Sequence, residues 1–266
     1  MISTSSILNA AVFCSLLVAV QAKESANYSL WPQRPAQLET ARELVRAGRC
    51  EAAVELLQPF VAQKGIAGRE ARQITSAINV RRYLSHEHPG LATYKVRRGE
   101  NLTRIAAATK CPADVIMLLN GMVEPSSLKV GQSLVYVPMR LRMEVRPLQR
   151  ELSVWDGTVL VAAYSLELDA SWPGKTNEET EVTARHGYLG DVPLPKHDMR
   201  YLSSERVLVL SNGWSIASGR RLRGNVLRMD SGDLNELTLL MGIGGRVSFV
   251  CDERAFRASQ KSSRQD

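Results

Sequence analysis

Few residues in this chain could perform nucleophilic or metal chemistry. Beyond the apolar N-terminal stretch, Cys50, Cys111 and Cys251 fall in three separate segments. A reactive cysteine needs a lowered pKa, and a zinc site needs closely spaced Cys and His ligands. His86 and His88 stand only two residues apart, which is not such a spacing. We therefore expect no metal site and no cofactor, and single thiols that pack like small apolar groups. A Cys50–Cys111 disulfide is the alternative.

The residues from 93 to 138 change from strand periodicity to helix periodicity and back. The first of them alternate apolar with basic side chains, as a half-buried strand does. Ile105 lies on one apolar helix face, and Asn101 can cap that helix by accepting a backbone N–H. A second apolar run ends at Asn120 and Gly121, which tolerate a left-handed backbone. A closing strand follows, so the pattern predicts a small β-α-α-β unit.

The sequence of residues 94–138, YKVRRGENLTRIAAATKCPADVIMLLNGMVEPSSLKVGQSLVYVP, resembles a LysM domain, the module that binds N-acetylglucosamine-containing glycans such as peptidoglycan. The resemblance implies that two loops contact the glycan. The first loop reads Gly-Glu-Asn-Leu where the family usually has Gly-Asp-Thr-Leu, and both versions keep an acid and a capping oxygen. The glycan-contacting positions implied are Gly99, Glu100, Asn101, Leu102 and Thr103 in the first loop, and Gly121, Met122, Val123 and Pro125 in the second.

Residues 139–256 have the pattern of a β-rich domain. Asp156-Gly157 and Asn212-Gly213 each lie between apolar runs, which is a strong signal for a two-stranded hairpin. Residues 233–241 have helical periodicity and precede a last strand that ends at Cys251. The Gly- and Pro-containing stretch 171–199, which holds two of the histidines, is expected to be a lid or a surface loop.

The segment GNVLRMDSGDLNELTLLMGIGGRVSFV, residues 224–250, resembles the catalytic domain of L,D-transpeptidases, which cross-link peptidoglycan through a cysteine nucleophile. Arg228 matches the family pattern. Val226 stands where the family has its cysteine, and Ala217 stands where it has histidine. Acyl transfer of this kind needs a thiolate and a base within hydrogen-bond reach. We therefore expect a degenerate domain without catalytic residues, in which Ala217, Val226 and Arg228 mark the former site. A substitute dyad of Cys251 with a histidine is the alternative.

Residues 37–85 lack strand alternation and carry two apolar helix faces separated by Gly48. The segment ARELVRAGRCEAAVELLQPF resembles one tetratricopeptide-type helical hairpin, and a third helix is expected over residues 67–84. Such repeats normally stack in order to bury their apolar faces, and no second copy follows here. The segment is therefore expected either to pack within the protein or to dock a partner protein.

The two ends of the sequence and its net charge indicate where in the cell the protein is expected to act. Residues 1–22 have an apolar core and a small-residue cleavage site, as a secretory signal peptide does, and are too short for a confident membrane span. A linker is expected at 23–36, and a polar, disordered tail at 257–266. The net charge of +7 favours anionic polymers of the cell envelope. Nucleic acid is not expected as a partner, because the chain carries no motif that binds it.

These observations predict a multidomain α+β protein: a helical hairpin segment at 37–85, a β-α-α-β glycan-binding module at 93–138, and a β-rich, L,D-transpeptidase-like domain at 139–256. The predicted function is that of an exported, non-catalytic protein of the periplasm or cell envelope that attaches to peptidoglycan. Two alternatives stay open. One is an active L,D-transpeptidase, and the other is an envelope scaffold protein that acts through its helical segment.

Overall fold

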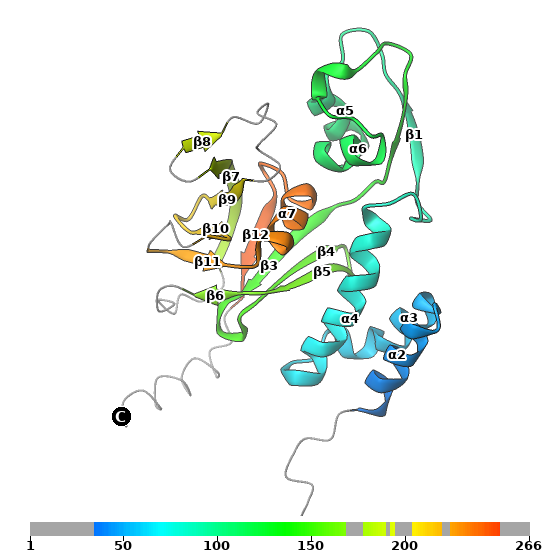
Figure 1. Ribbon diagram of the computed structural model, residues 1–266, viewed down its shortest axis with the longest axis vertical. Coiled ribbons are helices and arrows are strands. Elements are labelled where there is room, and N and C mark those ends of the chain that lie inside the picture. Colours follow the sequence, from blue (N-terminus) through cyan, green and yellow to red (C-terminus); the bar gives the residue numbers. More distant parts are fainter. Residues whose placement is uncertain (1–34, 169–177, 190–191, 195–203, 220–223, 251–266) are drawn as a thin grey trace, which may run out of the picture.

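The structure is a computed structural model that describes residues 35–168, 178–189, 192–194, 204–219 and 224–250. The expected signal peptide at 1–22, nearly all of the linker, the tail at 257–266 and Cys251 lie outside these residues. Figure 1 shows three parts: helices α2–α4, a small module with two helices, and a large sheet with α7 beside it. The predicted mixed α+β architecture is confirmed. No helix in the described part of the chain is long and apolar enough to cross a membrane.

The N-terminal part is a three-helix unit made of α2 (Ala36–Arg46), α3 (Cys50–Val61) and α4 (Gly65–Tyr83). Its first two helices form the predicted hairpin, and Gly48 takes the positive φ of 74° that the turn between them requires. Apolar side chains at helical spacing, such as Leu38 and Leu57, are buried in its centre. Pro59 lies in the last turn of α3.

The β-α-α-β module consists of β1 (Ala92–Lys95), α5 (Leu102–Thr109), α6 (Ala113–Leu119) and β2 (Ser133–Tyr136), with a short 3-10 turn, η1 (Pro125–Ser127), before β2. Its two strands pair antiparallel, and Tyr94 lies opposite Leu134. Asn101 caps α5 as predicted, because its side-chain oxygen accepts the Arg104 backbone N–H at 2.9 Å. The β-α-α-β order expected from the sequence is therefore confirmed.

Asn120 joins the second helix of this module to its closing strand. Its amide nitrogen donates to the Ile116 carbonyl at 2.7 Å and to the Val135 carbonyl at 2.8 Å. Its amide oxygen accepts the Val135 N–H at 2.8 Å. The side chain thus pairs with both backbone groups of one strand residue, much as a neighbouring strand would.

The remaining strands form one continuous ten-stranded sheet. They are β3 (Leu141–Arg146), β4 (Glu151–Asp156), β5 (Val159–Ser165), β6 (Glu167–Leu168), β7 (Glu178–Leu189), β8 (Val192–Leu194), β9 (Glu205–Leu210), β10 (Ser215–Ala217), β11 (Val226–Arg228) and β12 (Arg246–Phe249), with η2 (Pro147–Gln149) between β3 and β4 and α7 (Ser231–Leu240) before β12. The order is β5-β4-β3-β12-β7-β9-β10-β11-β6, and β8 pairs with β7. Because β5 and β6 are consecutive in the chain, the ladder begins and ends on the same segment.

Local turn chemistry predicted two hairpins of this ladder, and a long strand was missed. β4 and β5 turn at Gly157, and β9 and β10 turn at Gly213, both with positive φ. The stretch 171–199 was expected to be a lid or surface loop, and for residues 178–189 this was wrong: they form β7, which joins β12 to β9. Its side chains are mostly charged or polar, so it lacks the apolar alternation by which strands are recognised.

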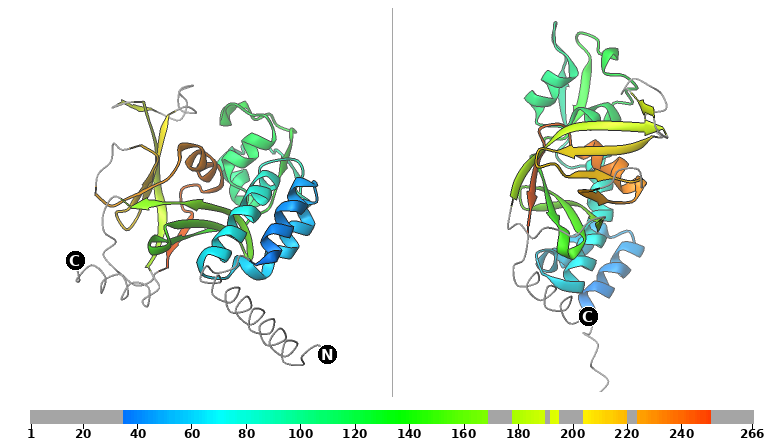
Figure 2. Two further views of the ribbon diagram at one scale, coloured as in Figure 1. Left: turned by 60° about the horizontal axis from the view of Figure 1, so that its bottom comes forward. Right: turned by 90° about the vertical axis from the view of Figure 1, so that its left-hand side faces the viewer.

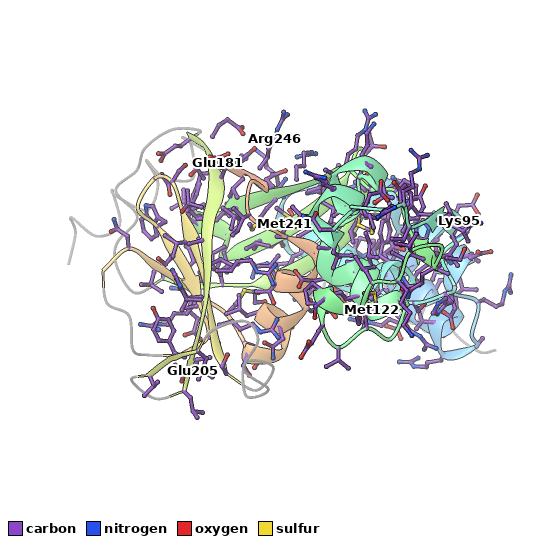
Figure 3. The ribbon with its side chains drawn as sticks, turned by 90° about the horizontal axis from the view of Figure 1, so that it is seen from above. Lys95, Met122, Glu181, Glu205, Met241 and Arg246 are labelled. Atoms are coloured by element: carbon purple, nitrogen blue, oxygen red, sulfur yellow. The ribbon has the colours of Figure 1, made fainter. Side chains whose placement is uncertain are left out.

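The module and the sheet share one apolar core. Buried side chains from α5, α6, β2, β3, β12 and α7 belong to the same cluster. Met241, which follows α7, lies between the sheet and the module (Figure 3). A partly buried ion pair between Asp114 on α6 and Arg185 on β7 also joins the two parts. The module is therefore packed against the sheet and is not an independent domain on a linker.

Helix α4 covers the edge strand β5 of the sheet, and Figure 2 shows the three helices gathered beside it. The Ser76 hydroxyl accepts the Ala163 N–H at 2.8 Å, and the Asn79 amide donates to the Leu160 carbonyl at 2.6 Å. Side chains of a helix thus satisfy backbone groups that an edge strand would otherwise expose. Trp155 and Leu160 pack into the apolar centre of the helical hairpin.

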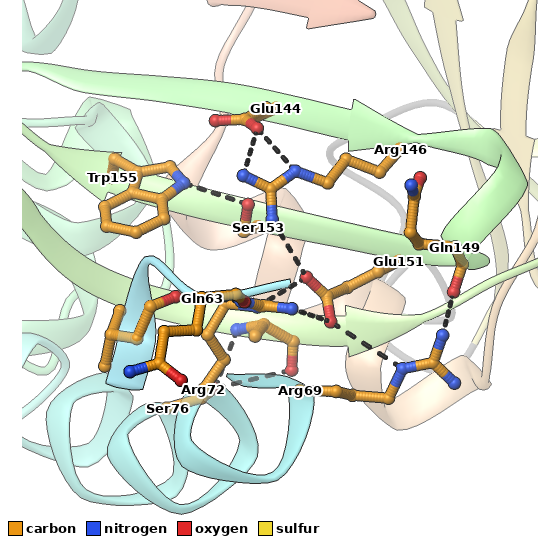
Figure 4. A network of polar contacts seen from close by, with 12 residues as sticks. Gln63, Arg69, Arg72, Ser76, Glu144, Arg146, Gln149, Glu151, Ser153 and Trp155 are labelled. Carbon is orange, nitrogen blue, oxygen red and sulfur yellow. Dashed lines mark hydrogen bonds and ion pairs between the residues drawn. The ribbon is translucent and has the colours of Figure 1, made fainter. Parts of the chain in front are cut away.

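A buried ion pair fixes the same interface (Figure 4). The Arg72 guanidinium on α4 donates to both carboxylate oxygens of Glu151 on β4, at 2.6 and 3.1 Å. Its remaining nitrogen donates to the carbonyls of Val61 and Gln63 at the end of α3. The side chains of Arg72 and Glu151 are only 3% and 5% exposed. One guanidinium therefore holds α3, α4 and β4 together.

Removal of this guanidinium should destabilise the protein strongly. Arg72→Ala removes the two hydrogen bonds to the buried Glu151 carboxylate, which keeps only Arg146 at 3.7 Å and Arg69 at 4.0 Å, and it leaves two carbonyls without their donor. We therefore expect a loss of about 3 kcal/mol in the free energy of unfolding. Urea denaturation followed by circular dichroism measures it. Arg81→Ala is the control, because its pair with Glu87 is exposed and should contribute under about 1 kcal/mol. Equal losses in the two variants would contradict the assigned role of Arg72.

The Asn120 bridge is tested with an isosteric change. Asn120→Asp replaces the donating nitrogen with an oxygen that faces the Ile116 and Val135 carbonyls, so we expect about 2–4 kcal/mol of destabilisation at neutral pH. Burial near carbonyls raises the pKa of the new carboxyl, so the destabilisation should shrink as protonation restores a donor at low pH. Asn101→Asp is the control, because that side chain only accepts, and thermal unfolding of both variants across pH 3–8 is the measurement.

Candidate functional site

The first loop of the β-α-α-β module is held by its own side chains. The Tyr94 hydroxyl donates to the Glu100 carboxylate at 2.7 Å, and the Arg97 backbone N–H donates to it at 2.8 Å. These two hydrogen bonds keep the pKa of Glu100 below its usual range. The charged carboxylate thus closes the turn around Gly99, whose φ is 79°. Each of its oxygens already accepts one hydrogen bond, so the carboxylate is held in place by the loop.

The other residues expected in the first loop divide into exposed and buried positions. Leu102 is only 4% exposed and packs in the core of the module, so its side chain cannot reach a ligand. Gly99, Asn101 and Thr103 are exposed. The Asn101 oxygen is used in capping α5. This loop therefore offers a ligand backbone groups and the Thr103 hydroxyl.

The second loop forms one wall of a shallow depression of about 530 Å³. Three of the four residues expected there, Gly121, Met122 and Val123, line it, whereas Pro125 begins the neighbouring turn η1. Figure 3 looks down on the module and shows Met122 nearer the sheet than Lys95 is. The residues that line the depression are Asn120, Gly121, Met122, Val123, Glu124, Ser127, Lys129 and Gln132. None of the first-loop residues, all of which the structure describes, is among them.

Sequence reasoning missed the opposite wall of this depression. Ser127 ends η1, and Lys129 and Gln132 come from the segment between η1 and β2, which was read as part of the closing strand. The Gln132 side-chain oxygen accepts the Lys129 N–H at 3.0 Å, which shapes the turn. Val123, on the other wall, is 86% exposed. The depression combines hydrogen-bonding groups with exposed apolar surface, and a sugar ring presents hydroxyls and apolar C–H faces that match both.

In the sheet, the three positions that were expected to mark a former catalytic site come together but offer no nucleophile. Ala217 on β10 lies opposite Arg228 on β11, and Val226 stands two residues earlier on β11. Ala217 and Val226 are each 2% exposed and form a buried apolar cluster with Val207 of β9. Arg228 is buried and lies opposite Glu167 of β6. Side chains of valine and alanine can neither attack a carbonyl nor accept a proton.

The described thiols and histidines do not form an alternative centre. Cys50 and Cys111 are free, so the disulfide considered between them does not form in this structure. Burial raises the pKa of the Cys111 thiol to about 11, which keeps it protonated at neutral pH. His186 lies on β7 beside Tyr188. No group of three or more His, Cys, Asp or Glu side chains among the described residues could hold a metal ion.

Two comparisons with known proteins give matches and one gives none. The LysM domain family matches residues 94–136. No curated protein matches the chain. Among solved structures, an L,D-transpeptidase from Xylanimonas cellulosilytica is 14% identical over 43% of this chain and 64% of its own length, with a TM-score of 0.28. This chain therefore spans less than two thirds of that structure.

Two further solved structures are similar to the same degree. Mycobacterium tuberculosis L,D-transpeptidase 1 is 10% identical over 46% of this chain and 67% of its own, with a TM-score of 0.31. A mutant L,D-transpeptidase from Enterococcus faecium is 9% identical over 74% and 82%, with a TM-score of 0.29. The chain therefore carries a LysM domain at residues 94–136, and its structural neighbours include L,D-transpeptidases.

Proposed function

We propose that this chain is an exported, non-catalytic protein that attaches to peptidoglycan, or to a related N-acetylglucosamine-containing glycan, through its LysM domain. The observation that carries the proposal is the depression at the second loop of a module matched by the LysM family. The net charge of +7 supports a place beside anionic polymers of the periplasm or cell envelope.

The walls of the depression suggest how a glycan is held. Val123 presents an exposed apolar side chain that can lie against a sugar face. Across from it, the hydroxyl of Ser127 and the ammonium of Lys129 can bond sugar hydroxyls or acetamido groups. A single small module buries little area, so we propose a weak affinity, of about 10–1000 μM.

The absence of catalysis rests on the apolar cluster around Ala217 and Val226. A cysteine placed at either position would be desolvated, which raises a thiol pKa and lowers the thiolate fraction. The cluster and the described residues packed against it, Tyr188 and Val209, contain no general base. His186 on β7 lies opposite Val207, but neither Ala217 nor Val226 supplies a thiol that it could activate. The sheet therefore serves as a support to which the LysM domain is packed.

Glycan binding is tested at the most exposed apolar residue of the depression. Val123→Asp places a charge against the sugar face, so we expect the affinity for insoluble peptidoglycan and for chitin oligomers to fall about tenfold or more, without loss of folding. Co-sedimentation and calorimetry measure it. The control is Ile66→Asp, an equally drastic change at a residue 68% exposed on α4. Binding that survives Val123→Asp would remove the depression from the glycan site.

The absence of acyl transfer is tested with a covalent probe. Incubation with peptidoglycan should give no new 3–3 cross-links and no exchange of D-amino acids, and a carbapenem should leave every cysteine unmodified, because Val226 and Ala217 stand at the positions expected for the nucleophile and the base. Val226→Cys with Ala217→His should also stay inactive, since an error of about 1 Å in placing reacting groups costs roughly a hundredfold. Mass spectrometry is the measurement, and a stoichiometric carbapenem adduct on the unmodified chain would make it an enzyme.

A further inference from the structure

A second hollow, of about 1030 Å³, lies on the three-helix unit and is unrelated to the glycan depression. It opens where the end of α2, the start of α3 and the second half of α4 meet. We call it the arginine groove. The residues that line it are Arg42, Val45, Arg46, Gly48, Arg49, Cys50, Glu51, Ala52, Ile74, Ala77, Ile78, Arg81, Arg82 and Glu87.

The floor of the arginine groove is apolar. Val45, Ile74 and Ile78 are half-buried and pack on the centre of the helical hairpin, so their outer surfaces face the hollow. Ala52 and Ala77 are small and leave room above them. The fully buried apolar face of the hairpin is already covered by Trp155 and Leu160 of the sheet. The floor is thus a separate apolar surface that no described residue covers.

The rim of the groove is basic, and five arginines line it. Arg42 is already paired with Glu39 and Glu70, and the other four face only two lining acidic residues, Glu51 and Glu87. Their ion pairs are loose: Arg81 lies 3.5 Å from Glu87 and Arg82 lies 3.3 Å from Glu51, and both carboxylates are more than half exposed. Such pairs contribute about 0–1 kcal/mol and are easily exchanged for another carboxylate.

Two further arginines of the rim are more open. Arg46 is 69% exposed and lies 3.7 Å from its nearest carboxylate, on Glu39. Arg49 is exposed, and its guanidinium has no ion-pair partner among the residues that the structure describes. A guanidinium binds a carboxylate through two parallel hydrogen bonds, which makes arginine well suited to acidic ligands.

We propose that the arginine groove binds an acidic amphipathic segment of a partner protein. Apolar side chains of that segment lie on Val45, Ile74 and Ile78, and its carboxylates pair with Arg46, Arg49 and Arg81. This combination of an apolar floor and a charged rim is how grooves hold amphipathic helices. The proposal does not rest on the proposed glycan binding, because none of the groove residues belongs to the LysM domain.

Charge decides between the possible occupants. A second copy of this chain carries a net charge of +7 and would be repelled by a basic rim. The two terminal segments of the chain, 1–34 and 251–266, each carry more basic than acidic residues and do not complement it either. A purely anionic surface would satisfy the rim and leave the apolar floor uncovered. An acidic amphipathic segment satisfies both.

The test uses a designed helical peptide of about 18 residues, or five turns, with leucine on one face and glutamate on the other. Fluorescence anisotropy measures its affinity for the full chain. We expect Arg46→Glu with Arg49→Glu to weaken binding about tenfold or more, and Ala77→Trp to do the same by filling the groove from an exposed helix position. Added salt should weaken binding too, and the same peptide with lysine for glutamate should not bind.

The matched control is Lys95→Glu with Arg246→Glu, which changes the net charge equally. Both residues are exposed, and Arg246 lies on β12, away from the helices (Figure 3). Binding should be unchanged in this control, and co-sedimentation with peptidoglycan should be unchanged in the groove variants. An equal loss in the control, or no loss with Ala77→Trp, would reduce the effect to nonspecific charge and overturn the proposal. Anionic phosphatidylglycerol vesicles that bind through the groove more tightly than the peptide would overturn it in favour of a membrane surface.

Cys50 supplies a second, independent readout. Its half-buried thiol lines the groove at the start of α3, whereas Cys111 is buried elsewhere. Bound acidic peptide should slow alkylation of Cys50 by a maleimide about tenfold at saturation, as peptide mapping by mass spectrometry would measure. Protection should be absent in the Ala77→Trp variant. Alkylation of Cys50 at the same rate with and without saturating peptide would place the peptide outside the groove.

Discussion

The packing of the three-helix unit against the sheet depends on a buried ion pair between residues 79 positions apart, Arg72 and Glu151. The guanidinium satisfies a carboxylate on β4 and two carbonyls at the end of α3, so it fixes the helical hairpin and the sheet with one side chain. A buried pair of this kind contributes less to net stability than to selecting one geometry, because desolvation offsets much of the attraction. We regard that selection as its role here.

Around this pair, each part of the protein covers apolar surface or backbone groups that its neighbour would otherwise expose. Ser76 and Asn79 of α4 form hydrogen bonds with the backbone of the edge strand β5, which would otherwise be open to pairing with another chain. The small LysM domain, which could bury little apolar surface alone, shares its core with the sheet through α6 and α7. The sheet in turn closes its ladder on the single segment that forms β5 and β6. The parts are therefore interdependent in stability.

The sequence predicted what local chemistry determines. Asn101 was recognised as a helix cap, and Gly157 and Gly213 marked hairpins, because each signal lies within a few residues. The strand β7 was missed, because its identity comes from pairing with β9 and β12, not from its own mostly polar residues. The far wall of the glycan depression, with Lys129 and Gln132, was missed for a similar reason: a polar turn carries no signal of what it faces.

The same distinction explains the former catalytic positions. From the sequence, Val226 and Ala217 could be recognised only as replacements of an expected nucleophile and base. The structure shows that they also pack well, because together with Val207 they form a buried apolar cluster across adjacent strands. A polar pair at these positions would require hydrogen-bonding partners or water, and a valine and an alanine require neither.

The two candidate ligand surfaces of the chain lie on the parts that flank the sheet. The sheet packs against α4 through β5 and against α6 through α7. It therefore fixes the position of the glycan depression relative to the arginine groove. A partner bound at the groove would thereby be placed beside the glycan that we propose as the ligand of the LysM domain.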